Sequence, residues 1–104
     1  MRVELLYFAG CPTYVRLLPR LRELVAQLAP EATLALRRIE SIEQAERERF
    51  LGSPTVRVDE VDVDPGAGER EEFGLECRLY RSAGVTAPMP PTEWIRAALT
   101  GAAV

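Results

Sequence analysis

The chain has 104 residues, of which 47% are hydrophobic and 28% are charged, and this composition is typical of one globular domain. Every basic residue is an arginine and histidine is absent, which excludes a histidine general base, a histidine metal ligand and a Ser/His triad in this chain. The net charge of −3 and the lack of a clustered basic stripe argue against a nucleic-acid partner.

The sequence also argues against a membrane partner. No apolar run reaches the length of a bilayer span, and Met1 leads directly into a strand pattern without a signal peptide. We therefore expect a cytoplasmic protein. In a reducing compartment its two cysteines, Cys11 and Cys77, are expected to be thiols with a chemical role or inert core residues, and not a structural disulfide.

The first part of the chain predicts a strand followed by a helix. The short apolar run from Val3 to Phe8 predicts a strand that is buried on both faces. A helix is predicted from Pro12, which suits a first helical position, to about Leu28, and Pro19 is expected to kink it or to separate its first turns. Apolar residues recur along this helix at three- and four-residue steps. They are Val15, Leu18, Leu21, Val25 and Leu28, with Leu17 and Leu24 widening the stripe.

A second strand, a second helix and a hairpin are expected next. Residues 33–39 are predicted to form a strand parallel to the first, because a right-handed crossover joins the two. Ser41 suits the N-cap of a helix from about Ile42 to Phe50. A third strand is predicted to open at Ser53-Pro54-Thr55, and the turn Asp59-Glu60 is expected to lead into a fourth strand at residues 61–63.

The remainder predicts an insert and a last helix. Residues 64–90, called the insert below, begin and end in Pro/Gly-rich sequence, and residues 73–80 within them fit a short strand or a helical turn equally well. Thr92 is expected to cap a helix whose buried face includes Trp94. The order β-α-β-α-β-β-insert-α predicts a single α/β domain over residues 1–104 with a mixed four-stranded sheet.

Cys11 lies where the first strand gives way to the first helix. Unpaired N–H groups and the positive end of the helix dipole favour a thiolate at such a place, where thiol pKa values fall from roughly 8.5 to about 3.5–7.5. The alternative is that Cys11 is a small buried apolar residue. Its position alone leaves both interpretations open.

Three local features resemble the thioredoxin family. The strand that ends in Phe8-Ala9-Gly10-Cys11-Pro12-Thr13-Tyr14 is similar to the active-site turn with its leading cysteine. Pro19 stands where thioredoxins carry the proline that kinks the active-site helix. Ser53-Pro54-Thr55 stands where the family has its cis-proline, which faces the cysteine and offers backbone groups to an extended substrate. The resemblance covers residues 2–63 and the last helix, and it implies a thioredoxin-like fold.

The sequence departs from that family at Tyr14, which stands where the usual dithiol has its second cysteine. The resemblance therefore points to the single-cysteine branches and implies a thiol-disulfide oxidoreductase that acts through Cys11. Cys77 is the internal candidate for resolving a mixed disulfide, and a small thiol is the external one. The resemblance implies a substrate site formed by Pro12, Tyr14, Ser53, Pro54 and Thr55.

Several alternatives stay open at this stage. Tyr14 is also explained as a partly buried aromatic residue, Pro54 as an edge-strand proline and Cys77 as a small packed residue. The protein could instead be a binding module that kept the fold and lost turnover, or two thiols could bind a soft metal ion. Two cysteines without histidine fall short of a structural zinc site, so we expect no metal and no cofactor. The expected partner is a protein or a small molecule that carries a thiol or a disulfide.

Overall fold

The computed structural model describes residues 1–101 as an α/β arrangement with three helices and a mixed four-stranded sheet. The sheet order is β2-β1-β3-β4. Strand β1 pairs parallel with β2 and antiparallel with β3, and β3 pairs antiparallel with β4. The elements are β1 (Arg2–Tyr7), α1 (Thr13–Leu28), β2 (Thr33–Arg38), α2 (Ile42–Arg47), β3 (Thr55–Val58), β4 (Val61–Asp62), a 3-10 turn (Ala67–Glu69), β5 (Tyr80–Ser82), β6 (Val85–Ala87) and α3 (Thr92–Thr100).

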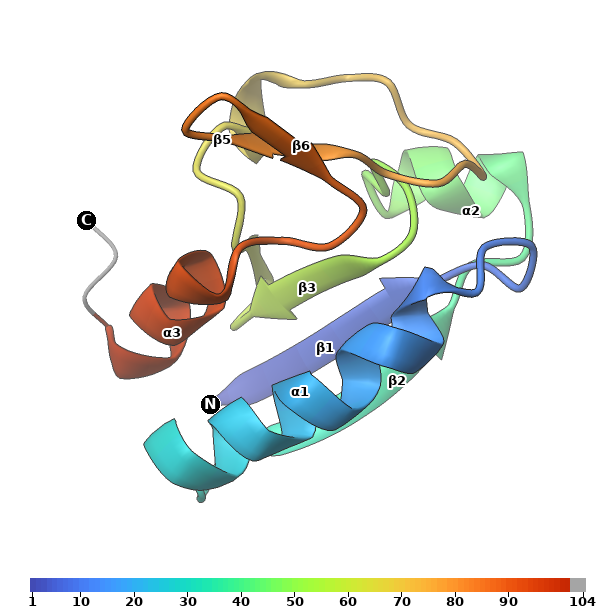
Figure 1. Ribbon diagram of the computed structural model, residues 1–104. Coiled ribbons are helices and arrows are strands. Elements are labelled where there is room, and N and C mark those ends of the chain that lie inside the picture. Colours follow the sequence, from blue (N-terminus) through green and yellow to red (C-terminus); the bar gives the residue numbers. More distant parts are fainter. Residues whose placement is uncertain (102–104) are drawn as a thin grey trace.

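The sheet is covered on both faces because side chains of a strand alternate in direction. Val3 and Leu5 of β1 pack with the buried residues of α1 and α3 in one apolar cluster. Leu6 packs with Ile39, with α2 and with Phe50 in a second cluster on the other face. Figure 1 shows α1 lying across β1 and β2. The predicted burial of the first strand on both faces is confirmed.

One acidic residue is buried in this strand. The side chain of Glu4 is 4% exposed and lies 3.2 Å from Arg37 and 3.4 Å from Arg2. Arg37 also pairs with Glu48 at 2.7 Å, and these partners offset the cost of burying the Glu4 charge. The apolar sequence of the first strand did not predict that Glu4 pairs with Arg37 of β2.

The predicted order of elements is confirmed, but several boundaries were wrong. Helix α2 ends at Arg47 and not at Phe50, because Arg49 takes a left-handed conformation (φ 55°) and directs Phe50 into the core. Pro12 is the N-cap of α1 and not its first residue. Pro91 caps α3, so Thr92 is the first helical residue and not the cap.

The stripe predicted for α1 is also rotated in the structure. Leu17, Leu21, Leu24 and Val25 are buried, whereas Val15 is 57% exposed because it lies almost opposite Leu17 on the helix. The helix runs unbroken through Pro19, which is exposed and displaces no core side chain. No helix within residues 1–101 has the length and apolar character that crossing a bilayer requires.

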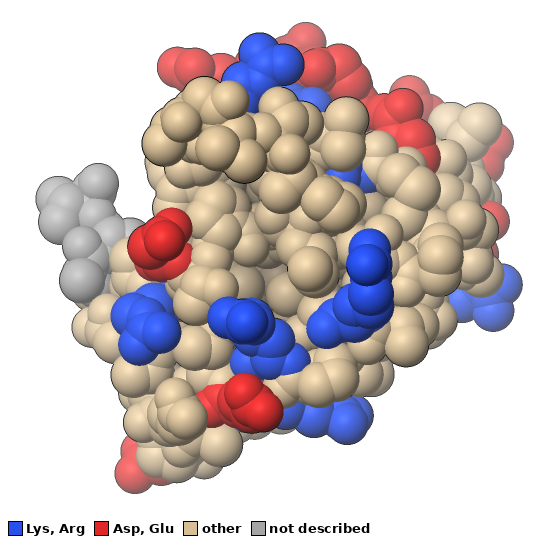
Figure 2. Space-filling view, in the orientation of Figure 1, with Lys and Arg blue, Asp and Glu red and all other residues tan. Residues whose placement is uncertain are grey.

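Charge is distributed unevenly over the surface. Helix α1 carries three arginines and one acid, whereas residues 69–72 of the insert carry three acids and one arginine. On the face shown in Figure 2, basic side chains lie over α1 and acidic side chains lie along the upper edge. The surface around α1 is therefore basic although the chain as a whole is acidic.

The insert is folded back onto the sheet by a buried arginine. Arg78, whose side chain is 0% exposed, pairs with Asp62 at 2.7 Å and with Asp64 at 3.2 Å. Its guanidinium also donates to the Thr55 hydroxyl at 3.0 Å and lies 4.4 Å from the centre of the Tyr80 ring. We call these five residues the Arg78 cluster; it ties the insert to β3 and to the hairpin.

Replacing this arginine is expected to destabilise the protein. Arg78→Met keeps much of the side-chain volume but leaves the carboxylates of Asp62 and Asp64 without their cation. We expect the free energy of unfolding, measured by urea denaturation, to fall by about 3 kcal/mol, as for other buried pairs that lose one partner. The matched control is Arg81→Met, because Arg81 is exposed. Equal stability of the two variants would contradict a structural role of the cluster.

Candidate functional site

Cys11 is held in a tight turn between β1 and α1. Its N–H donates to the carbonyl of Phe8 at 3.2 Å. A Cβ atom at Gly10 would lie 2.5 Å from the Phe8 ring, so the turn needs glycine at this position for the ring to pack. Cys11 immediately precedes Pro12, the N-cap of α1, and the predicted position beside a helix N-terminus is confirmed.

The Cys11 sulfur is covered but has polar surroundings. Cys11 is 1% exposed and belongs to neither apolar cluster. Its Sγ lies 3.7 Å from the Thr13 hydroxyl and 3.6 Å from the Ser53 carbonyl oxygen. A residue that merely filled the core would not need hydrogen-bonding partners, so the second interpretation of Cys11, as a small apolar residue, fits these contacts poorly.

The Ser53-Pro54 segment brings the insert to this sulfur. The peptide bond between Ser53 and Pro54 is cis. The Ser53 N–H donates to the Glu76 carbonyl at 2.8 Å, and the Arg78 N–H donates to the Ser53 carbonyl at 2.9 Å. Cys77 thus lies opposite Ser53 in a one-residue parallel bridge. We call residues 76–78 the covering segment. Residues 73–79 form neither of the two predicted elements, because residues 74–76 bend and Cys77 alone makes a bridge before β5 begins at Tyr80.

The two thiols differ in acidity. Burial raises the pKa of Cys11, but hydrogen bonds from the Cys77 thiol, from the N–H and hydroxyl of Thr13 and from Ser53 outweigh it, so the pKa of Cys11 lies below that of an ordinary thiol. The hydrogen bond with Cys11 raises the pKa of Cys77, and burial and the charge of Cys11 add to this rise. The pair therefore holds its first negative charge on Cys11 and keeps a proton on Cys77.

The Ser53 hydroxyl has a specific relation to this charge. Ser53 is fully buried, and its Oγ has no hydrogen-bond partner in the neutral arrangement within residues 1–101. The same side chain is among the groups that lower the pKa of Cys11. An unpaired buried hydroxyl is costly, and a thiolate at Cys11 gives it an acceptor.

The other residues predicted for the site have different roles. The Tyr14 ring stacks on Tyr7 with 4.0 Å between ring centres, which fits the interpretation as a covering aromatic residue. Thr55 lies within β3 opposite Leu6 of β1, and its hydroxyl bonds the Gly52 carbonyl at 2.6 Å and accepts from Arg78. The site therefore uses the Thr55 side chain to hold the insert, where the sequence analysis expected its backbone to hold a substrate.

Sequence reasoning missed three residues that position Cys77. Arg78 and Tyr80 are buried on either side of the exposed Leu79, and the Tyr80 hydroxyl donates to the Pro54 carbonyl. Burial is also the main cause that raises the pKa of Tyr80, which keeps this donor protonated. Gly52 (φ 124°) allows the covering segment to approach, since a Cβ there would lie 2.9 Å from the Glu76 carbonyl. Glycine before Ser53-Pro54 was the available sequence signal.

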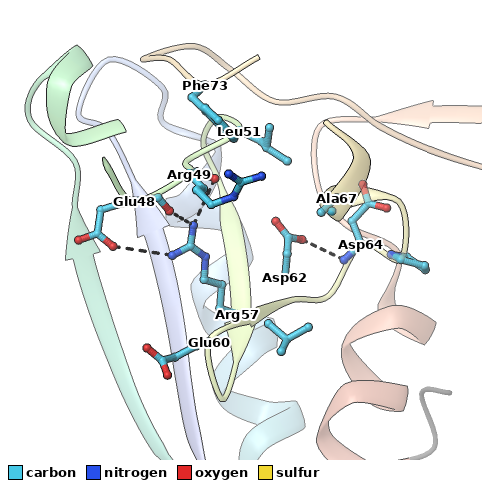
Figure 3. A pocket seen from close by; sticks show the side chains of 12 residues that line it. Glu48, Arg49, Leu51, Arg57, Glu60, Asp62, Asp64, Ala67 and Phe73 are labelled. Carbon is cyan, nitrogen blue, oxygen red and sulfur yellow. Dashed lines mark hydrogen bonds and ion pairs between the residues drawn. The ribbon is translucent and has the colours of Figure 1, made fainter. Parts of the chain in front are cut away.

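One hollow on the surface lies away from these thiols. It has a volume of about 500 Å³ and is lined by residues of the β3–β4 hairpin, of the insert and of the segment after α2. Its charged side chains are largely paired with one another or with Arg78, as Figure 3 shows for Arg57 and Glu48. Because most of these charges already have partners and no thiol lines the hollow, we place the candidate functional site at Cys11.

Metal binding at this site would have to rely on the two thiols. Within residues 1–101, no group of three or more His, Cys, Asp or Glu side chains could hold a metal ion. Two thiolates suit a soft ion of low coordination number, whereas structural zinc needs four ligands. The alternative of a soft-metal site thus depends on Cys11 and Cys77 alone.

The sequence matches no protein-family model and no curated protein, and no solved structure matches the chain. The chemistry of the two thiols and of the Ser53-Pro54 segment is therefore the basis for a functional proposal.

Removing the Cys77 thiol is expected to raise the pKa of Cys11, because the Cys11 thiolate loses a hydrogen-bond donor. Cys77→Ala and Cys77→Ser each leave Cys11 as the single thiol, and only serine keeps a donor. We expect the thiolate absorbance of Cys77→Ala, measured in the ultraviolet during a pH titration, to rise at higher pH than that of Cys77→Ser. Identical midpoints in the two variants would show that Cys77 does not stabilise the charge.

Proposed function

We propose that the protein is a thiol-disulfide oxidoreductase with a thioredoxin-like fold, acting through Cys11 with Cys77 as its resolving thiol. The order β-α-β-α-β-β-α around a sheet of order β2-β1-β3-β4 supports the fold. A cysteine at the N-terminus of α1, opposite a cis-proline in the loop before β3, supports the resemblance stated from the sequence. The insert that carries Cys77 is an addition to this fold.

The observation that carries the proposal is the pairing of two thiols of opposite acidity beside Ser53. Cys11 has a lowered pKa and Cys77 a raised one, and each thiol is among the causes of the other's shift. The geometry beside these shifts is that Cys77 lies opposite Ser53, whose carbonyl oxygen is 3.6 Å from the Cys11 sulfur. The thiolate is the reactive form in disulfide exchange. A second thiol that keeps its proton is available for the second step.

The proposed reaction has two steps. The Cys11 thiolate attacks one sulfur of a disulfide RSSR, forming a Cys11–S–S–R mixed disulfide and releasing one RS⁻. Cys77 then gives its proton to the released RS⁻ and attacks the Cys11 sulfur, which forms a Cys11–Cys77 disulfide and releases the second RS⁻. The two cysteines give up two electrons and RSSR gains them. Two molecules of a low-molecular-weight thiol return the protein to its dithiol form by the reverse exchange.

A binding module that has lost turnover is the competing function. Such a module would keep the sheet and the helices, but it would have no need for hydrogen bonds that favour a thiolate at Cys11 or for a second cysteine beside it. Thr13 offers Cys11 an N–H and a hydroxyl that lower its pKa, and Cys77 lies opposite Ser53. These two features favour the redox function over this alternative.

Replacing Cys11 and replacing Cys77 are expected to block different steps of the reaction. Cys77→Ser should react with a small disulfide and stop at the mixed disulfide, because its second thiol is missing. Cys11→Ser should react more slowly, because it lacks the thiol of lowered pKa and keeps only Cys77, whose pKa is no longer shifted by Cys11. Mass spectrometry of the quenched reaction distinguishes one added RS group from an internal disulfide. Oxidation of Cys11→Ser at the rate of the parent protein would rule out Cys11 as the nucleophile.

A further inference from the structure

We propose, on the basis of the function proposed above, that the disulfide substrates of this protein are small molecules and not extended peptides. The covering segment, residues 76–78, already fills the backbone edge at Ser53 on which an extended peptide would bind. The chain thus supplies its own backbone partner at this place, with Cys77 in the position opposite Ser53.

Peptide strands bind to a protein edge through free main-chain groups, and at Ser53 these groups are not free. The Ser53 N–H is bonded to Glu76 and the Ser53 carbonyl to Arg78. The carbonyl of Pro54 accepts from the Tyr80 hydroxyl. A second strand could bind here only after the covering segment had left.

The covering segment is firmly attached on the C-terminal side of Cys77. The Arg78 cluster holds its C-terminal end, and Tyr80 packs against Trp94 of α3 with 6.3 Å between ring centres. Displacing the segment would remove the buried cation from Asp62 and Asp64. Leaving a buried charge without its partner is costly, so spontaneous exchange with a peptide is unfavourable.

The surface on which the segment lies is also shaped for it. A Cβ atom at Gly52 would lie 2.9 Å from the Glu76 carbonyl and 3.0 Å from the Arg78 Cβ. Glu76 and Arg78, which approach Gly52 this closely, are also the two residues that hydrogen-bond to Ser53. The glycine therefore admits the covering segment at a distance that no side chain would allow.

A small disulfide does not need this edge. Cys77 is exposed, whereas Cys11 is 1% exposed. The Ser53 carbonyl oxygen, opposite Cys77, lies 3.6 Å from the Cys11 sulfur. Rotation of the Cys77 side chain changes none of the backbone hydrogen bonds of the covering segment. A small molecule can then reach Cys11, whereas a peptide strand still finds Ser53 occupied.

The first test measures the covering segment in the parent protein by amide hydrogen exchange. The amides of Ser53 and Arg78 are expected to exchange slowly. The N–H of Leu79 donates to no backbone carbonyl within residues 1–101 and serves as the internal control, which should exchange fast. Exchange of Ser53 and Arg78 at the rate of Leu79 would overturn the proposal without the need for any variant.

The second test compares two probes that carry the same thiopyridyl leaving group. One is the mixed disulfide of N-acetylcysteine, and the other is that of a peptide with the sequence of residues 74–80. Each rate of leaving-group release is divided by the rate of the same probe with free cysteine. With the reduced parent protein, the corrected rate of the peptide probe should be lower than that of the N-acetylcysteine probe by a factor of about ten or more. A factor of ten corresponds to about 1.4 kcal/mol.

Arg78→Met provides the release variant, and Arg81→Met is its matched control. Weakening the hold on the covering segment opens the Ser53 edge, and Asp62 and Asp64 can accept the arginine of the peptide. The difference between the probes should shrink severalfold in Arg78→Met and stay unchanged in Arg81→Met. A peptide probe in which methionine replaces the arginine should react with Arg78→Met no faster than with the parent protein.

The outcomes separate the two proposals. If neither probe yields a Cys11–Cys77 disulfide, the proposed function is wrong and the substrate class falls with it. If both probes react equally well with the parent protein, the oxidoreductase function stands and the restriction to small molecules is wrong. If the peptide probe still reacts slowly with the folded Arg78→Met variant, the covering segment is not what excludes peptides, and the proposal is overturned.

Discussion

The buried ion pairs of Arg78 with Asp62 and Asp64 fix the geometry on which the site depends. They join the insert to the β3–β4 hairpin, and the hydrogen bond to Thr55 extends the connection to the strand that follows Pro54. With Arg78 held, its N–H reaches the Ser53 carbonyl, and Cys77 lies opposite Ser53. The acidities of both thiols follow from this placement, because each thiol shifts the pKa of the other.

Much of the fold could be predicted because its signals are local and regular. The apolar run of β1, the Ser41 cap and the Asp59-Glu60 turn each follow from the properties of neighbouring residues, and the structure contains all three. The errors are at element ends and in the orientation of α1. These depend on which turn of a helix meets the sheet, and spacing alone does not specify that for a helix with apolar residues on most of its circumference.

The site was harder to predict because its key contacts run against hydrophobic patterning. In residues 77–80 the buried side chains are Arg78 and Tyr80, whereas Leu79 is 62% exposed. A pattern that places leucine inside gives the opposite register. The position of Cys11 followed from the strand, the glycine and the proline around it, whereas the position of Cys77 depends on an ion pair with residues of another segment.

The Thr55 hydroxyl joins two parts of the molecule that could otherwise vary separately. It donates to the Gly52 carbonyl in the loop before Ser53 and accepts from Arg78 in the insert. Under the proposed function, sequence changes that admit larger substrates by loosening the insert would therefore also weaken the loop that presents the cis-proline. A wider substrate range would then be accompanied by a lower thermal stability.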